Sequence, residues 1–269
     1  GIKLVVAPVE ENGEVIAERV IECFTDRTRL LAIAAVSNAL GTILPLETVI
    51  PAAKARDITG LVDCAQHAPH APIDVANLGA DFFAFSGHKM TGPTGIGVLW
   101  GRDALLEAMP PWQGGGDMIE TVSFEGTTYN ALPYKFEAGT PYIAGAVGLA
   151  AAIDYLESVG MDNIQRYEGI LLDYLTEQMS AQDDIRIIGT APKKASVVSF
   201  LMDDVHPHDL GTIVDQRGIA VRTGHHCAMP VMNLLEVPGT ARASLALYNW
   251  REDIDALIEA LTTVRDLFR

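Results

Sequence analysis

The chain has 269 residues, of which 49% are hydrophobic and 20% charged, and its formal net charge is −16. This length and composition fit a folded protein of one large or two moderate domains and exclude a disordered or fibrous chain. The acidic balance, with no Lys/Arg-rich run, argues against nucleic acid or an anionic membrane as a partner. The longest apolar run, 30–36, is too short to cross a bilayer, and no signal-peptide pattern is seen, so we expect a cytoplasmic or organelle-matrix location.

The first hundred residues alternate short apolar strands with helical patterns. Strands are predicted at 30–36, 60–64, 80–85 and 95–100, and helices at 14–24 and 46–56. This alternation predicts an α/β sheet with parallel strands, in which ligands bind beyond the carboxyl ends of the strands. Five polar residues follow such ends: Ser37, Asn38, Asp63, Gln66 and Ser86. Each alone suits a turn or a helix cap, but five along one edge indicate a binding site.

The remainder of the chain has a different pattern. Residues 110–141 form a long irregular segment rich in Gly, Pro and Thr, and loops of this length are usually functional. The elements predicted after it are helices at 144–159, 161–179, 208–217 and 251–268, and strands at 185–188, 195–201, 218–222 and 241–247. This mixture is typical of a smaller α+β domain. We therefore divide the chain into 1–155, a large-domain part, and 156–269, a small domain.

Lys89 is the residue whose position most clearly indicates a role in catalysis. It stands in the run Phe-Ser-Gly-His-Lys-Met at 85–90, directly after an apolar strand and just before the Gly-Pro-Thr-Gly run at 92–95. An amine held at a strand end can form a Schiff base with a carbonyl. The alternative is an ordinary surface lysine in a loop.

The residues near Lys89 complement one particular cofactor. Asp63 ends a predicted buried strand, where a carboxylate is costly unless a cation, such as a protonated ring nitrogen, is its partner. Gln66 follows three residues later, and Ser86 and His88 flank the lysine with donors suited to phosphate. Such a set suits pyridoxal 5'-phosphate, which takes a Schiff-base lysine and an acidic group on its ring nitrogen. Asp63 by itself would also suit a helix cap or a turn.

Cys227 is the cysteine with a polar setting. It follows Arg222, His225 and His226 in a loop between two predicted strands, where charged neighbours would favour the reactive thiolate. Two alternatives are a small buried hydrophobic residue and a metal site. Three adjacent side chains, however, cannot easily be aimed at one ion, so no metal is predicted.

The other cysteines and histidines are given structural roles. The three cysteines contain no C-x-x-C pair, which argues against a disulfide framework or structural zinc. Cys23 and Cys64 lie in apolar patterns and are expected in the core. His206 and His208 are expected to be loop and cap residues.

Together these motifs resemble the class V aminotransferase group of fold-type I pyridoxal-phosphate enzymes, and within it the type II, Suf-type cysteine desulfurases. The matching segments are 36–42, 63–66, 85–95, 136–141, 222–228 and 242–244. The R-x-G-H-H-C-A loop at 222–228 discriminates best, because the lysine and aspartate alone would also fit aminotransferases and kynureninase-like enzymes. The resemblance implies a PLP-dependent transferase fold of type I, with a partial large α/β domain and a smaller α+β C-terminal domain.

The resemblance also implies a role in cofactor binding for five residues. Lys89 would hold pyridoxal 5'-phosphate and then act as acid and base. Asp63 would keep the ring nitrogen protonated, and Gln66 would contact the ring oxygen. Ser86 and His88 would bind the phosphate.

A second group of residues would serve the substrate. Asn38, Arg242 and Arg222 would bind the carboxylate of L-cysteine, which a planar guanidinium can meet with two parallel hydrogen bonds. Cys227, with His226 beside it, would be the nucleophile that takes the sulfur.

As a whole, the resemblance implies a homodimeric L-cysteine desulfurase that yields L-alanine and a persulfide on Cys227. Thr140 would reach the phosphate site of the partner copy, and a Suf-type acceptor protein would take the sulfur for iron–sulfur cluster assembly. Selenocysteine lyase is a close alternative, and a truncated, non-catalytic scaffold subunit is a more distant one. The resemblance starts inside the family's large domain, so we expect about the first third of a full-length member to be absent and apolar surface to be exposed.

Overall fold

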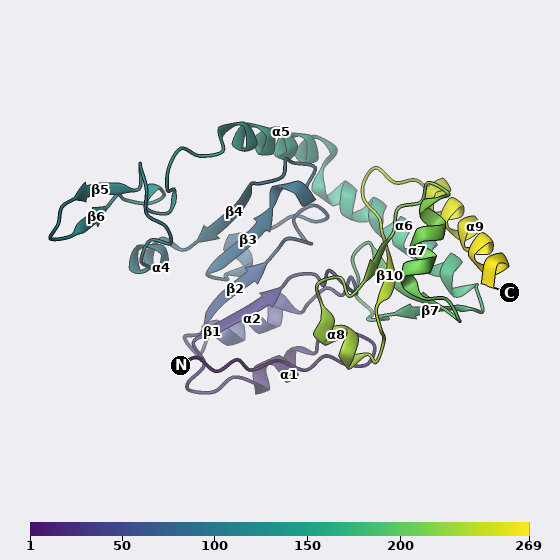
Figure 1. The fold of residues 1–269 in the computed structure, drawn as a ribbon. Helices are drawn as coiled ribbons and strands as arrows, with labels where there is room; N and C mark the ends of the chain where they lie inside the picture. The colour runs from purple at the N-terminus through teal and green to yellow at the C-terminus, as the bar shows by residue number, and fades with distance from the viewer. Residues whose placement is uncertain (269) are drawn as a thin grey trace.

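The computed structural model describes residues 1–268 and contains two main β-sheets, one in each half of the molecule (Figure 1). The large sheet has the order β1 (Leu30–Ala34), β2 (Thr59–Asp63), β3 (Phe82–Ser86) and β4 (Gly97–Gly101). The first three strands are parallel and β4 is antiparallel to β3. The four predicted strands are confirmed, with bounds that differ by one or two residues.

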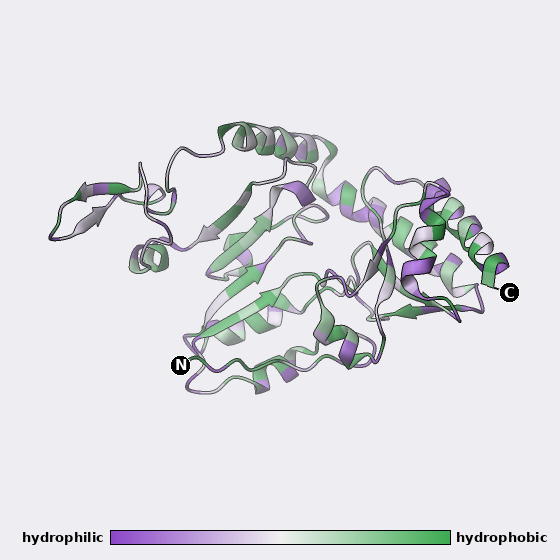
Figure 2. Cartoon of the chain, in the orientation of Figure 1, coloured by the Kyte–Doolittle hydropathy of each residue, from purple (hydrophilic) through white to green (hydrophobic). Residues whose placement is uncertain are grey.

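Helices cover one face of the large sheet. They are α1 (Ala17–Glu22), α2 (Leu46–Lys54) and the short α3 (Val75–Leu78). Val49 of α2 packs with Val62 and Phe83 of the sheet in one buried cluster, and Figure 2 shows how apolar these strands are. Because side chains alternate along a strand, Asp63 points to the opposite face from Val62 and Cys64. The strand-end carboxylate therefore lies on the face that these helices leave free.

Apolar side chains are exposed in the N-terminal half, as expected from the sequence. Ile2 is 103% exposed, Leu4 84% and Val6 79%, and Leu30 of β1 is 55% exposed. Large apolar side chains with this exposure leave apolar surface in contact with water.

The segment 110–141, which follows β4 and α4 (Asp103–Ala108), is more regular than the sequence indicates. It contains an antiparallel hairpin of β5 (Ile119–Val122) and β6 (Thr127–Tyr129), and a 3-10 turn η2 (Tyr134–Phe136). The hairpin projects from the body (Figure 1), and its strands are largely exposed. Because neither face of the hairpin is buried, its sequence lacks the alternation of apolar and polar residues that indicates a strand. The prediction of a wholly irregular segment was wrong in this respect.

Two long helices connect the halves. α5 (Ile143–Val159) and α6 (Met161–Ser180) meet at Gly160 with a bend of 72°. Within residues 1–268, neither helix by itself is long and apolar enough to cross a membrane; only the bent pair passes on length and composition. The predicted domain boundary at 155/156 falls in the last part of α5.

The small sheet is antiparallel, with the order β7 (Ile185–Ile188), β8 (Val197–Met202), β10 (Thr240–Ser244) and β9 (Arg222–Gly224). α6, α7 (Pro207–Asp215) and α9 (Arg251–Phe268) pack with it around their own core, in which Phe200 and Leu261 are fully buried. The strand predicted at 218–222 begins only at Arg222, where pairing with β10 starts. α8 (Met229–Leu234) follows the cysteine loop and was not predicted.

Candidate active site

The predicted cofactor residues follow the carboxyl ends of two neighbouring strands. Asp63 is paired with Ala84, and β3 continues for two more residues to Ser86. Alternation puts Asp63, Ala84 and Ser86 on the same face of the sheet. The 3-10 turn η1 (Gly87–Lys89) follows at once, and both His88 and Lys89 are exposed. The amine and the carboxylate predicted to hold one ring thus share one edge of the sheet.

A tight glycine turn fixes the position of Lys89. The carbonyl oxygen of Gly87 accepts hydrogen bonds of 3.0 Å from the backbone N–H groups of both Met90 and Gly92. A Cβ atom at Gly92 would lie 2.8 Å from that same oxygen, which a real side chain cannot do. The glycine is needed so that the chain can fold back closely under the lysine.

Asp63 is available to a ligand on its open face. Its Oδ1 accepts a 2.8 Å hydrogen bond from the backbone N–H of Ala65, and the residue is exposed. Gln66 is half-buried in the same turn. Cys64 points the other way, and burial raises the pKa of its thiol to about 12, so this cysteine is an inert core residue as predicted.

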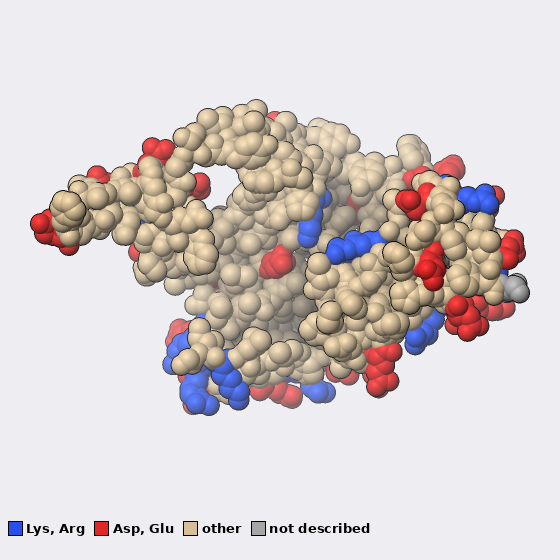
Figure 3. Space-filling model, in the orientation of Figure 1, with Lys and Arg blue, Asp and Glu red and all other residues tan. Residues whose placement is uncertain are grey.

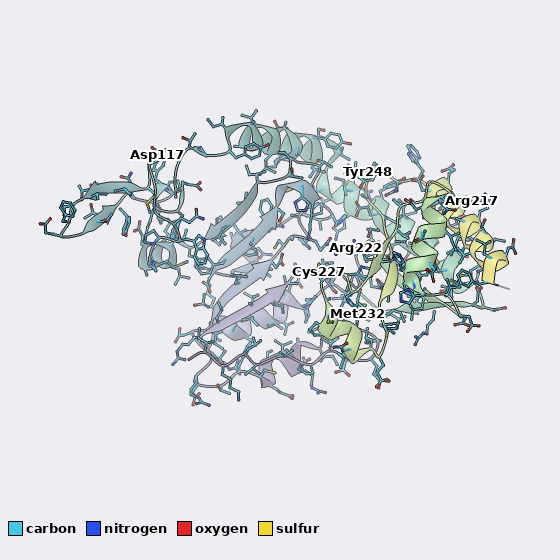
Figure 4. The ribbon with its side chains drawn as sticks, viewed as in Figure 1. Asp117, Arg217, Arg222, Cys227, Met232 and Tyr248 are labelled. Carbon is cyan, nitrogen blue, oxygen red and sulfur yellow. The ribbon has the colours of Figure 1, made fainter. Side chains whose placement is uncertain are left out.

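The cysteine loop joins β9 and β10 through α8, at the border of the small domain. In the register of these strands Arg222 lies opposite Arg242, and Cys227 is exposed. The Arg222 Nη2 atom donates to the Cys227 Sγ atom at 3.2 Å, and Figure 4 shows the two residues on the side that faces the large sheet. A guanidinium at this distance stabilises a thiolate. An exposed thiol with a cationic partner is at odds with the alternative of a buried hydrophobic residue.

Asn38 connects the two halves of the site. The Arg242 Nη1 atom donates to the backbone oxygen of Asn38 at 2.6 Å, and the Asn38 side-chain amide donates to the backbone oxygen of His226. Residues 188 and 204 positions apart in the sequence thereby meet beside Cys227. Acidic and basic groups border the hollow between the large sheet and the small domain on the face shown in Figure 3.

His226 is not the cationic helper that the sequence suggested. It is 2% exposed, and its Nε2 atom lies 2.7 Å from the hydroxyl of Thr240. Burial, together with the positive charges of Arg242 and Arg222, lowers the pKa of His226 to about 4. The imidazole is therefore neutral at pH 7, and Arg222 is the cation that contacts the thiol.

The remaining predicted residues are spread more widely. Thr140 is exposed in the stretch before α5, and its predicted contact with a partner copy stays a prediction. His206 caps α7 by accepting a hydrogen bond from the backbone N–H of His208, as expected. Cys23 is only partly buried at the end of α1, where its thiol donates to a backbone oxygen, so its assignment to the core was too strong. Among residues 1–268, no three His, Cys, Asp or Glu side chains are placed to hold a metal ion.

Thr240 is the residue that sequence reasoning missed. It is fully buried and bonded to His226. Its position two residues before Arg242 in a strand places both on one face. This two-residue spacing from Arg242 was the sequence signal that could have identified Thr240.

A large cavity lies away from these residues. It has a volume of about 740 Å³ and is lined by Ala35, Cys64 and Phe83 on the helix-covered face of the large sheet. Asp63 and Ser86 face the other side, and the cavity contains none of the predicted site residues. The candidate site is defined by the convergence of strand ends and the cysteine loop, not by the size of a pocket.

The fold and this placement of lysine, aspartate and cysteine define a fold-type I pyridoxal-phosphate enzyme architecture. The aminotransferase class-V pattern matches residues 1–257, and the chain belongs to that family.

Within the family, two curated relatives are named as probable cysteine desulfurases. The chain is 48% identical over 270 residues to a probable cysteine desulfurase of Streptomyces coelicolor, and 49% identical over 268 residues to that of Halalkalibacterium halodurans. All of this chain is covered in both matches, with 65% and 66% of those relatives. The chain thus spans slightly less than two thirds of the length of these curated relatives.

Two solved structures are close in shape. The cysteine desulfurase CsdA of Escherichia coli, in its S-sulfonic acid form, gives a TM-score of 0.94 at 39% identity, covering 98% of this chain and 66% of that one. The apo cysteine desulfurase of Thermococcus onnurineus gives 0.93 at 39% identity, covering 97% and 66%.

Proposed function

We propose that the protein to which this chain belongs is a type II, Suf-type, pyridoxal-phosphate-dependent L-cysteine desulfurase. The observation that carries the proposal is the meeting of Cys227, Arg222 and Arg242 with Asn38, beside a sheet edge that presents Lys89 and Asp63. The names of the relatives at 48% and 49% identity support the same activity.

The donor set at the sheet edge fits the cofactor. Lys89 supplies an amine for the aldehyde, Asp63 a carboxylate for the ring nitrogen and Gln66 an amide for the ring oxygen, while Ser86 and His88 supply donors for the phosphate. When bound, pyridoxal 5'-phosphate supplies an electron-accepting ring for the substrate amine. No metal is required by this chemistry.

The chain's own residues then handle the sulfur. Arg242 and Asn38 hold the substrate carboxylate, and Lys89 moves protons at the substrate carbons. The Cys227 sulfur, held beside Arg222, attacks as a thiolate and forms a bond to the substrate sulfur while the carbon–sulfur bond breaks. The electron pair of the broken carbon–sulfur bond stays with the three-carbon fragment. The products are L-alanine, after protonation, and a persulfide on Cys227.

Mass measurement of the persulfide tests this role directly. The native protein, loaded with pyridoxal 5'-phosphate and given L-cysteine, is expected to gain one sulfur atom on the peptide that contains Cys227. Cys227→Ser should form no protein persulfide, whereas Cys23→Ser should behave like the unchanged protein. Persulfide at an undiminished level in Cys227→Ser would refute the assignment.

Two further outcomes would change the proposed function rather than the assignment of Cys227 as the nucleophile. Faster alanine release from L-selenocysteine than from L-cysteine would identify a selenocysteine lyase. No cofactor binding and no alanine from either substrate would favour a non-catalytic scaffold. Sulfur transfer to a purified Suf-type acceptor, and a twofold mass in solution, would test the proposed partner and the homodimer.

A further inference from the structure

The backbone at the cysteine loop adopts an unusual conformation. His226 and Cys227 are consecutive non-glycine residues with φ values of 54° and 60°. Each such residue costs about 1 kcal/mol or more, so the surrounding structure must hold the pair in place. Within the turn, the Ala228 N–H donates a local hydrogen bond of 2.9 Å to the oxygen of His225. The other contacts come from distant residues.

The first distant contact is with the strand pair beneath the loop. Thr240 opposes Gly224 and Arg242 opposes Arg222, so Thr240 and Arg222 present their side chains on one face. The loop folds back over this face and places two successive residues on it. His226 Nε2 reaches the Thr240 hydroxyl at 2.7 Å, and Cys227 Sγ reaches Arg222 Nη2 at 3.2 Å.

The second distant contact is with the large domain. The Asn38 amide donates to the backbone oxygen of His226, and Arg242 in turn donates to the oxygen of Asn38. His226 is 2% exposed and Thr240 fully buried, so water does not compete for the imidazole–hydroxyl hydrogen bond.

We propose that His226 is a positioning residue for Cys227: its bond to Thr240 and its carbonyl contact with Asn38 hold the left-handed turn in which the thiol meets Arg222. The charged and titratable groups that face the imidazole are Arg242, Arg222 and His225. Because the two arginines are cationic, the neutral imidazole is the form that fits there. The purpose of this positioning rests on the proposed function, but the inference itself concerns only the Cys227 thiol and its loop.

Thr240→Val tests the bond, because valine keeps the shape of threonine and removes the hydroxyl. The measurement is the rate at which iodoacetamide alkylates Cys227 in the native protein, followed by peptide mass spectrometry from pH 6 to pH 10, with Cys23 as internal reference. At pH 7 we expect the rate in Thr240→Val to fall by about 3- to 10-fold, because the sulfur is no longer held in its 3.2 Å contact with the Arg222 guanidinium. The deficit should close by pH 10, and the matched control Thr240→Ser should stay within about twofold of the unchanged protein.

Several results would overturn the inference. Equal rates in Thr240→Val and the unchanged protein would show that the bond does not position the thiol. A deficit of the same size at every pH would indicate blocked access instead of a lost arginine contact, and an equally slow Thr240→Ser would exclude the hydroxyl as the cause. If Thr240→Val does not fold, Asn38→Leu removes the other anchor and must show the same pH-dependent deficit. If the expected alkylation rates are measured but no persulfide forms on Cys227, the proposed function is refuted while the positioning role of His226 is supported.

Discussion

The two halves of the candidate site are held in place by different means. On the large sheet, Asp63 and Lys89 are exposed at the ends of parallel strands, and backbone pairing and a glycine turn define their positions. In the cysteine loop, Cys227 is positioned by side-chain contacts that reach back to Arg222 and, through His226, to Thr240 and Asn38. The sheet edge presents exposed polar side chains to a ligand, whereas the loop uses its polar atoms to hold one thiol in a strained turn.

This difference separates side chains that can be replaced without moving the backbone from those that cannot. Substitutions at the sheet edge should abolish cofactor binding or catalysis and leave the fold intact. Substitutions in the loop and at the domain junction should act through geometry, and their effects should depend on pH and on stability.

The largest effect is expected for Lys89→Ala. We expect the visible absorption band that pyridoxal 5'-phosphate gives when bound to the native protein to disappear, and alanine release to fall on the order of 10³-fold or more, because the amine that holds the aldehyde is gone. Lys194→Arg is the matched control, since burial lowers the pKa of Lys194 to about 8 and leaves more of its amine neutral than in an ordinary lysine. A band that survives in Lys89→Ala and is lost in Lys194→Arg would contradict the assignment.

The next effect concerns the buried imidazole of His226 and acid. Its pKa is about 4 in the folded chain and about 6.5 in an unfolded one, so the unfolded chain binds the extra proton between these values. Stability from this group is fully present above pH 6.5 and is lost as the pH falls toward 4, by up to about 3 kcal/mol. Urea unfolding at pH 7 and pH 4.5 should show a smaller pH dependence for His226→Gln than for the unchanged protein. Identical pH dependence in both would show that His226 is not buried as a neutral group.

Arg242→Lys should weaken substrate binding. Lysine presents a point charge where arginine presents a planar fork, so it cannot serve Asn38 and a carboxylate at the same time. The KM for L-cysteine should rise by about 10- to 100-fold, with a smaller change in kcat. Arg217→Lys, at an exposed position of the same domain, should leave both constants unchanged. A kcat loss with KM unchanged would place Arg242 elsewhere in the reaction.

The smallest effect is expected at the domain junction. Glu168 of α6 is 2% exposed and accepts from the Ser196 hydroxyl at 2.9 Å, and its Oε2 atom lies 2.7 Å from Nδ1 of His70 in the turn after β2. Glu168→Gln keeps the shape but weakens these contacts, and the free energy of unfolding should fall by about 1 to 2 kcal/mol. Glu157→Gln, exposed on α5, is the control for urea denaturation. Equal stability of the two variants would show that the cluster does not tie the domains together.

Much of the fold could be predicted because its elements carry local signals. The strands β1 to β4 are short apolar runs bounded by turn residues, and α9 was predicted with its observed bounds because its apolar stripe has a helical period. The β5–β6 hairpin and α8 were missed, since the first is exposed on both faces and the second is only six residues long.

The sequence by itself determined which chemistry is present: a lysine and an aspartate after two strands, and a cysteine in a polar loop. Only the tertiary structure decided how that chemistry is controlled. It brought Asn38 to the cysteine loop, paired Arg222 with the thiol and buried His226 against Thr240 as a neutral group. The physical reason is that strand ends are encoded by neighbouring residues, whereas burial and charge at His226 depend on residues up to about 190 positions away that meet only when the two domains pack.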